Sequence, residues 1–457
     1  MKPDRRAVLG GLLSSAALAG CGLVRSRPLS EPPEGFDRAA RRPPVVFVHG
    51  TFGSKLRNRA SGREIWPVGT SELLFSDYAE LELPLDPATG EDLPDAVVAT
   101  AVFEEAGSID FYGSLLEALS LAGGYRRAEP GSPVADTQPR QYAYLYDWRR
   151  DLADSARGLD AFIEQIRRDH GDSRLRVDLV AHSSGGLLVR YFLLYGDRAL
   201  AAAGPLEPAF AGLSKVRRVV AIGVPEIGLA YPVRSLIFGE TIGLNRIWPS
   251  TLATSHAAFQ ALPQGDDAWL IGGDGKPLRA DAFDPGFWRE NDLSVFHPAV
   301  RDHARHRRGG GAAGRAHLAV LERAFESRLA RARRLRDALR AAALPRDLPY
   351  FVVAGDCRST LARLVLERRG DRSYLRGAPG DVQWPQRGVP YPRLMLEPGD
   401  GIVTAASARA RPRIPPPGSP RAPAVISPRW ERFVCASHNQ LVVNLDCQRA
   451  LLRALGT

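Results

Sequence analysis

The chain has 457 residues, of which 44% are hydrophobic, and its 61 Lys and Arg residues against 51 Asp and Glu residues give a formal net charge of +10. This apolar share supports a sizeable core, in one large domain or two modest ones. Beyond the N-terminal region no apolar run is long enough to span a bilayer, which excludes a protein with several transmembrane helices.

Residues 1–20 have the layout of an export signal, with basic residues followed by an apolar stretch from Ala7 to Gly20. The segment from Leu18 to Cys21 resembles the lipobox of bacterial lipoproteins, in which cleavage precedes a Cys that is then acylated. The basic start also resembles a twin-arginine export signal, so the export route stays open. Gly22 follows the Cys, and in Gram-negative lipoproteins this pattern implies the outer membrane.

Residues 21–44 are expected to be the acylated Cys and a flexible tether, because they are rich in Arg, Pro and Ser. Loss of residues 1–20, which carry a net charge of +2, would leave a net charge of +8. For an exported lipoprotein the basic balance favours anionic lipid headgroups as partners, and no nucleic acid is expected. We therefore expect a lipid-anchored protein of the cell envelope, on the periplasmic face of the outer membrane.

Short β-rich runs then alternate with helical patterns. The expected strands cover residues 45–48, 142–146, 177–181, 219–222, 350–353 and 433–434. Helices are expected after the second strand, over 185–195 and over 440–455. This alternation is typical of a parallel sheet with helices on both faces.

Two stretches interrupt the alternation. Residues 54–108 are loop-rich, and residues 229–345 form an insertion where a cap over an active site would lie. The insertion ends in an Arg-rich helix over 315–343. Its apolar stripe favours packing on the domain over lying on a membrane surface; the stripe is Leu318, Leu321, Phe325, Leu329, Ala332, Leu335 and Leu339. The core is accordingly expected over 45–228 and 346–457.

The candidate nucleophile is Ser183, in a run from Ala181 to Gly185 that directly follows a predicted strand and opens a predicted helix. This is the nucleophile-elbow pattern, in which the Ser sits in a turn with positive φ and needs small residues on either side. The elbow presents only its middle residue, so His182 and Ser184 are not expected to act as the nucleophile.

A nucleophilic Ser also needs an oxyanion hole and a base. One oxyanion donor is expected to be the backbone N–H of Ser184, and the other that of Thr51, in a Gly-rich loop after the first strand. The base is His438, because chain order in this fold is Ser, acid, His and no other His follows position 317. Spacing alone leaves two acids open, Asp356 and Asp400.

Besides the acylated Cys21, the exported chain has three cysteines, and any of their three pairings would be compatible with an oxidising compartment; they are Cys357, Cys435 and Cys447. Their spacing fits no zinc site, and the histidines near position 303 lie among arginines without a carboxylate or Cys cluster. No metal and no organic cofactor is implied.

With these residues assigned, the chain resembles the lecithin:cholesterol acyltransferase and lysosomal phospholipase family of α/β-hydrolases. The segment 146–149, Tyr-Asp-Trp-Arg, resembles a family signature, and 48–56 resembles the family's oxyanion loop. The segment 399–403 is similar to its Gly-Asp-Gly-x-Val acid motif, which favours Asp400 as the acid, and His438 matches its catalytic His. Glu226 departs from the family pattern, because it replaces an aromatic residue near the expected position of the acyl chain or headgroup.

The resemblance implies an α/β-hydrolase fold and a serine hydrolase that acts on acyl esters of lipids through an acyl-enzyme, as a lipase, phospholipase or O-acyltransferase. Two alternatives remain: an esterase or thioesterase on non-lipid substrates, and a catalytically inactive envelope protein that uses the fold for binding. The order of Ser, acid and His disfavours the inactive protein.

Overall fold

The computed structural model describes residues 27–67, 76–106, 109–242, 244–264, 268–411 and 425–457. The expected signal peptide, residues 1–20, and the expected lipidation site, Cys21, lie outside the described residues. Among the helices that fall within these ranges, none has both the length and the apolar character needed to cross a membrane.

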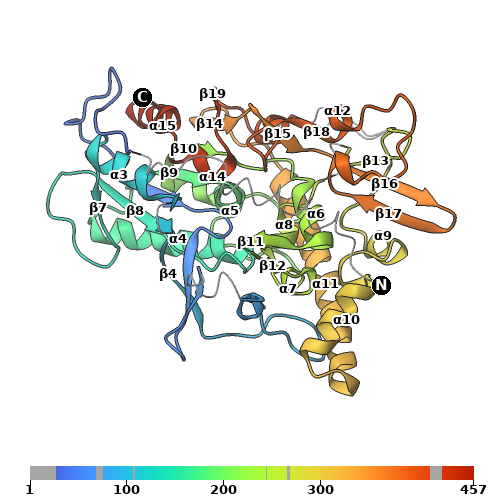
Figure 1. The fold of residues 1–457 in the computed structure, drawn as a ribbon. Coiled ribbons are helices and arrows are strands. Elements are labelled where there is room, and N and C mark those ends of the chain that lie inside the picture. The colour runs from blue at the N-terminus through green and yellow to red at the C-terminus, as the bar shows by residue number, and fades with distance from the viewer. Residues whose placement is uncertain (1–26, 68–75, 107–108, 243, 265–267, 412–424) are drawn as a thin grey trace.

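A seven-stranded sheet forms the centre of the molecule, in the order β19-β14-β10-β9-β1-β8-β7 (Figure 1). Every pairing between neighbouring strands is parallel. The strands are β1 (Val45–Val48), β7 (Arg126–Arg127), β8 (Arg140–Tyr144), β9 (Val177–His182), β10 (Val216–Ile222), β14 (Tyr350–Gly355) and β19 (Trp430–Val434). The six strands expected from the sequence all belong to this sheet, although the expected bounds differ by a few residues.

Helices cover both faces of the sheet, because alternate residues of each strand point to opposite sides. Val46 and Val48 of β1 pack in the same core as α4 (Leu152–Asp169) and α5 (Ser184–Tyr195). Val45 and Phe47 pack in a second core with α3 (Gly113–Leu121) and α15 (Leu445–Gly456). In Figure 1, α15 and α4 lie on opposite sides of the strands. The expected α/β-hydrolase fold is therefore present.

Residues 54–108, expected to be loop-rich, contain an antiparallel sheet of three strands in the order β3-β2-β4. Its strands are β2 (Ser54–Asn58), β3 (Glu64–Trp66) and β4 (Val97–Val102). Most residues of β2 are polar, and many turn residues lie between β3 and β4. Hydrophobic periodicity therefore does not identify this small sheet.

An accessory part with its own hydrophobic core lies beside the carboxyl ends of the central strands, at the right of Figure 1. Its helices are α6 (Tyr231–Phe238), α7 (Pro249–Leu252), α8 (Ala257–Gln260), α9 (Pro285–Glu290), α10 (Pro298–Arg307), α11 (Gly311–Arg340) and α12 (Tyr391–Met395). Its strands are β11 (Glu240–Ile242), β12 (Asn245–Ile247), β13 (Leu270–Gly272), β15 (Arg358–Leu361), β16 (Leu364–Arg369), β17 (Arg372–Arg376) and β18 (Leu396–Gly399). The parallel pairing of β13 with β16 means that this core draws on two separate stretches of the chain.

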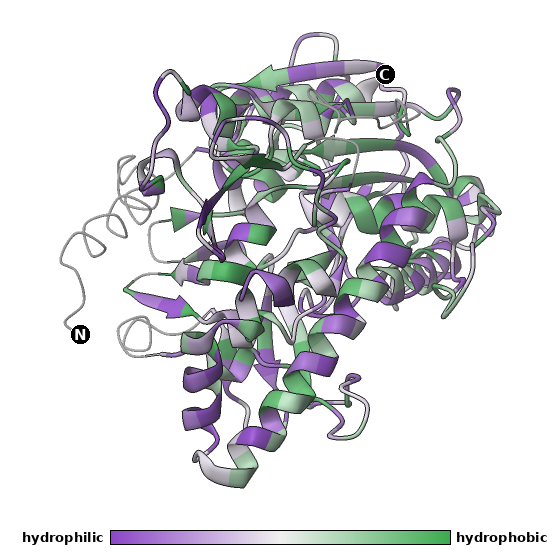
Figure 2. Cartoon of the chain, turned by 90° about the vertical axis from the view of Figure 1, so that its right-hand side faces the viewer, coloured by the Kyte–Doolittle hydropathy of each residue, from purple (hydrophilic) through white to green (hydrophobic). Residues whose placement is uncertain are grey.

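The Arg-rich helix α11 buries all seven residues of its apolar stripe, as expected for a helix packed on the domain. Figure 2 shows it rising from the bottom of the view with hydrophobic and hydrophilic patches in alternation. Two of the arginines on this helix are not solvated. Arg328 is buried and pairs with Asp92, and Arg336 is buried and donates to the backbone carbonyl of Glu226.

Candidate active site

Ser183 lies in the turn between β9 and α5, where it has φ 55° and ψ −131°. A positive φ is costly for a residue with a side chain, and such strain is typical of functional turns. The Ser183 backbone N–H donates to the Ile222 carbonyl of the neighbouring strand at 2.9 Å, which holds the turn against the sheet. The side chain thus stands beside the N-terminal end of α5, where partial positive charge gathers.

Glycines around the turn allow a close approach of two backbones. A Cβ added to Gly185 would lie 2.3 Å from the His49 carbonyl oxygen, and one added to Gly50 would lie 2.7 Å from the Ser183 Cβ. Any side chain at either position would push the loop after β1 away from the elbow. The small residues in both motifs are therefore required by packing between them.

The structure brings Ser183, His438 and Asp400 together. Ser183 Oγ lies 2.9 Å from His438 Nε2, and His438 Nδ1 lies 2.8 Å from Asp400 Oδ2. Because Nδ1 faces a carboxylate, it carries the proton, and Nε2 is left to accept the hydrogen of the Ser183 hydroxyl. The Asp400 side chain is almost fully buried, whereas Ser183 stays partly exposed.

Asp400 is held by its own loop, which follows β18. Its Oδ1 accepts hydrogen bonds from the backbone N–H groups of Ile402 and Val403, at 2.9 and 2.7 Å. Its carbonyl oxygen accepts from the backbone N–H of His438. Gly401 has φ 95°, which favours glycine. These bonds direct Oδ2 at the imidazole, and they explain why the motif brackets its Asp with flexible residues.

Asp356, the other candidate acid, is exposed in the loop after β14, and no bond to His438 is found for it. Its neighbour Cys357 forms a disulfide with Cys435, three residues before His438. The disulfide therefore ties the loop that carries His438 to the end of β14. Cys447 is buried and free, and burial raises the pKa of its thiol to about 12.

The two residues expected to supply the oxyanion donors, Thr51 and Ser184, are in contact, but the Thr51 N–H is already hydrogen-bonded within the protein. The Thr51 backbone N–H donates to Ser184 Oγ at 2.9 Å, and Thr51 Oγ1 is 3.0 Å from the same oxygen. Ser184 is the first residue of α5. A substrate oxygen that used the Thr51 N–H would have to replace Ser184 Oγ as its acceptor.

Two further histidines border the site and are neutral. Burial lowers the pKa of His49 to about 4 and that of His182 well below the ordinary value. The His182 ring lies 4.7 Å from the His438 ring, and its Nδ1 is hydrogen-bonded to the Tyr112 hydroxyl at 2.8 Å. The sequence gives no signal for Tyr112, because its partner groups come from distant segments.

Glu226 does not contribute a free charge near the nucleophile. Its carboxylate is fully buried, where it pairs with Arg190 of α5 and accepts a hydrogen bond from the Tyr350 hydroxyl at 2.8 Å. Glu226 therefore departs from the family pattern as a buried, paired carboxylate and not as an exposed charge. The carboxylate serves to neutralise an arginine inside the protein.

Replacing Glu226 with alanine is expected to destabilise the fold by about 3–5 kcal/mol, because it leaves the buried Arg190 without its carboxylate. Urea denaturation of the variant would measure the loss. The double variant Glu226→Leu with Arg190→Met is the control, and it should regain most of the stability because no charge remains unpaired. If Glu226→Ala were as stable as the parent protein, the fold would not need a carboxylate to neutralise Arg190.

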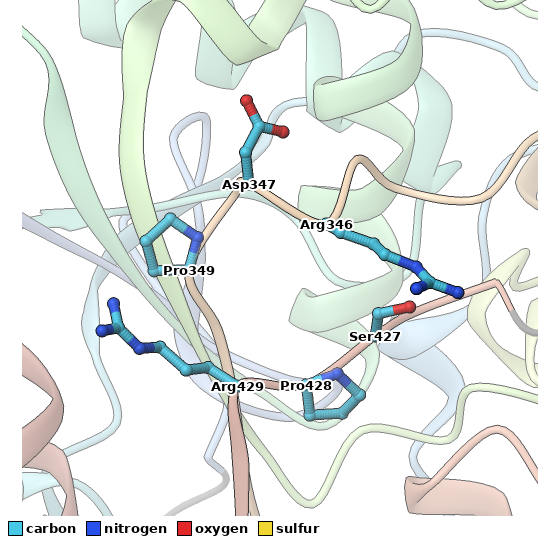
Figure 3. Close-up of a pocket in the computed structure, with 6 residues that line it drawn as sticks. All are labelled: Arg346, Asp347, Pro349, Ser427, Pro428 and Arg429. Atoms are coloured by element: carbon cyan, nitrogen blue, oxygen red, sulfur yellow. The ribbon is translucent and has the colours of Figure 1, made fainter.

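The pocket in Figure 3 is not part of this arrangement. It is lined by Arg346, Asp347, Pro349, Ser427, Pro428 and Arg429. These residues precede β14 and β19 of the central sheet, whereas Ser183 and His438 follow the carboxyl ends of β9 and β19 in the same sheet. In a parallel sheet the two groups lie at opposite edges. Within the described residues, no cluster of three or more His, Cys, Asp or Glu side chains could hold a metal ion.

Three solved structures are similar to this chain in backbone trace, although their sequences are only 14–16% identical to it. A chain of the Tle4–Tli4 complex is 16% identical, with 90% of this chain and 98% of that chain covered and a TM-score of 0.49. The mature lipase BlEst2 of Bacillus licheniformis is 14% identical, with 94% and 96% covered and a TM-score of 0.34. Lipase 1 of Pelosinus fermentans is also 14% identical, with 92% and 99% covered and a TM-score of 0.34.

The sequence itself was compared with protein families and with curated proteins. No curated protein matches it. The family described as lecithin:cholesterol acyltransferase matches residues 138–280, a segment that begins just before β8 and includes the elbow. The match over residues 138–280 thus agrees with the resemblance drawn from the motifs inside this segment, the run at 146–149 and the elbow around Ser183.

Proposed function

We propose that this chain is a serine-dependent enzyme with Ser183 as its nucleophile. In coarser terms, the family match and the fold support an acyl-ester hydrolase or acyltransferase. The single observation that carries the finer proposal is the line of two hydrogen bonds from Ser183 Oγ through His438 to Asp400. That line supplies a nucleophile, a base and a group that fixes the tautomer of the base.

In the proposed reaction, Ser183 Oγ attacks the ester carbonyl carbon while its proton passes to His438 Nε2. The carbonyl oxygen becomes an oxyanion, which the backbone N–H groups of Thr51 and Ser184 stabilise. The tetrahedral intermediate collapses, and the alcohol leaves with the proton from His438. Water or an alcohol acceptor then attacks the acyl-Ser183 ester, with His438 as base again.

The expected acyl group is that of a phospholipid or another lipid. An aromatic cluster beside the oxyanion loop supports an apolar substrate. The Phe52 ring lies 4.4 Å from the Trp148 ring and 4.8 Å from the Trp66 ring, between centroids. Both Trp rings are buried, and Phe52, which follows Thr51 in the chain, is the ring of this cluster that stays partly exposed.

Fluorophosphonate labelling, followed by a comparison of substrates, tests the proposal. The probe should modify Ser183, and the enzyme should release fatty acid from phosphatidylcholine vesicles faster than it hydrolyses p-nitrophenyl acetate at matched ester concentration. Turnover of the soluble ester with untouched vesicles would instead indicate an esterase on non-lipid substrates. A folded protein that forms no adduct would indicate a binding platform without activity.

We also propose that the protein is anchored to the periplasmic face of the outer membrane through acylated Cys21. The lipobox resemblance and the basic balance of the chain support this location. Cells that express the protein should incorporate labelled palmitate into it, and the Cys21→Ser variant should not. Equal incorporation by both proteins, or none by the parent, would contradict the anchor while leaving the proposed chemistry unaffected.

A further inference from the structure

In the loop after β1, both polar groups of the peptide unit between His49 and Gly50 are hydrogen-bonded to tyrosine hydroxyls. The His49 carbonyl oxygen accepts a hydrogen bond from the Tyr146 hydroxyl at 2.7 Å. The Gly50 N–H, in the same peptide unit, donates to the Tyr112 hydroxyl at 3.2 Å. Both polar groups of the unit are therefore satisfied by side chains rather than by backbone partners, and the orientation of its plane depends on two phenols.

The two tyrosines reach the loop from opposite faces of the central sheet. Tyr112, the residue before α3, belongs to the core formed with α3 and α15. Tyr146, which follows β8, belongs to the core formed with α4 and α5. Both are nearly fully buried, with 5% of their surface exposed. The peptide is thus held between two separate hydrophobic cores, neither of which can shift easily.

Further contacts restrict each phenol. The Tyr146 ring stacks on the His49 ring, with centroids 4.2 Å apart and planes inclined by 4°. The Tyr112 hydroxyl is hydrogen-bonded to Nδ1 of His182, the residue before Ser183, at 2.8 Å. Burial raises the pKa of both phenols above the ordinary value, so each keeps its hydrogen across the working range of an enzyme.

The held peptide lies where a small displacement would affect chemistry. The next N–H along the chain is that of Thr51, the proposed oxyanion donor, and the Gly50 position packs directly against Ser183. Oxyanion stabilisation needs a donor fixed about 2.7–3.1 Å from the developing charge before the reaction begins. A rotation of the His49–Gly50 plane would change the direction of the Thr51 N–H, which donates to Ser184 Oγ here and would donate to the oxyanion once it replaces that acceptor.

We propose that Tyr112 and Tyr146 are positioning residues for the oxyanion loop, whose hydroxyls hold the His49–Gly50 peptide so that the Thr51 N–H faces the oxyanion. Neither phenol donates to the substrate. This inference rests on the proposed function, since it assigns the two residues a part in the same reaction. It predicts that the loss of a hydroxyl weakens binding of the transition state and leaves binding of the ground state almost unchanged.

The test uses the variants Tyr112→Phe and Tyr146→Phe, which keep the buried rings. Each should lower kcat for p-nitrophenyl butyrate by about tenfold or more, with KM changed by less than about threefold. A trifluoromethyl ketone, which forms a tetrahedral adduct with an oxyanion, should bind more weakly by about the same factor as kcat falls. Thermal unfolding measured alongside should show that both variants are folded.

Tyr144→Phe is the matched control. Tyr144 is also a buried tyrosine of this part of the chain, and its hydroxyl donates to the Ser155 carbonyl at 2.7 Å, away from the oxyanion loop. Its loss should leave kcat and ketone binding within about twofold of the parent, because no group near the oxyanion changes partner. An equal loss in all three variants, or unchanged kcat in the first two, would overturn the inference.

Hydrogen exchange separates failure of this inference from failure of the proposed function. The amides of residues 50–53 should exchange faster in Tyr112→Phe and Tyr146→Phe than in the parent or in Tyr144→Phe, whether or not the protein is active. If the parent formed no fluorophosphonate adduct and had no activity, while the variants still showed this exchange pattern, the result would contradict only the assignment of the protein as an enzyme. Unchanged exchange of these amides in both variants would refute the proposal that the two tyrosine hydroxyls fix the oxyanion loop.

Discussion

Replacing Ser183 with alanine is expected to lower kcat for ester hydrolysis by about a millionfold, the cost typical of removing the nucleophile from such a triad. The variant keeps the backbone of the elbow, the His438–Asp400 bond and both backbone N–H groups of the expected oxyanion hole. It therefore loses only the atom that is proposed to form the acyl-enzyme. Active-site titration with a fluorophosphonate, followed by hydrolysis of p-nitrophenyl butyrate, measures the effect.

Ser184→Ala is the control for this experiment. Ser184 is adjacent to the nucleophile, but its side chain bonds Thr51 rather than His438. Its proposed part in the reaction belongs to the backbone N–H, which alanine retains. The variant should keep its adduct and at least about a tenth of the parent activity. An adduct that persists in Ser183→Ala and disappears in Ser184→Ala would move the nucleophile by one residue.

Replacing Asp400 with asparagine is expected to lower kcat by about ten-thousandfold, because an amide can donate to His438 Nδ1 and thereby place the proton on Nε2. Nε2 would then be unable to accept the hydrogen of Ser183, although the atoms of the site would stay in place. The measurement is kcat on a soluble ester, with circular dichroism and thermal unfolding as evidence that the variant is folded.

Asp356→Asn is the matched control, since Asp356 was the other acid that spacing allowed. It is exposed and follows β14, whereas Asp400 is buried and bonded to the imidazole. Its replacement should change kcat by less than about threefold. If Asp356→Asn were inactive and Asp400→Asn fully active, the assignment of the acid would be reversed.

Inner strands of the central sheet such as β1, β9 and β14 could be predicted because they are buried on both faces and form continuous apolar runs, whereas the exposed edge strand β7 was not predicted. Short strands with few apolar residues, such as β2 and β3, gave no comparable signal. The pairing of Cys357 with Cys435 also needed the structure. Spacing leaves three pairings open, and only the approach of the loops after β14 and β19 selects one.

The sequence by itself determined the elbow around Ser183, the order of nucleophile, acid and base, and the motif that favours Asp400, because each depends on a few neighbouring residues with strict steric or chemical needs. Tertiary structure decided what distant segments do to one another. It paired Glu226 with the buried Arg190, and it brought the Thr51 N–H to Ser184 Oγ. It also placed the His49–Gly50 peptide between the hydroxyls of Tyr112 and Tyr146. These contacts join residues far apart in the chain, and their distances are set by the register of the sheet and the packing of its two faces, which no local pattern records.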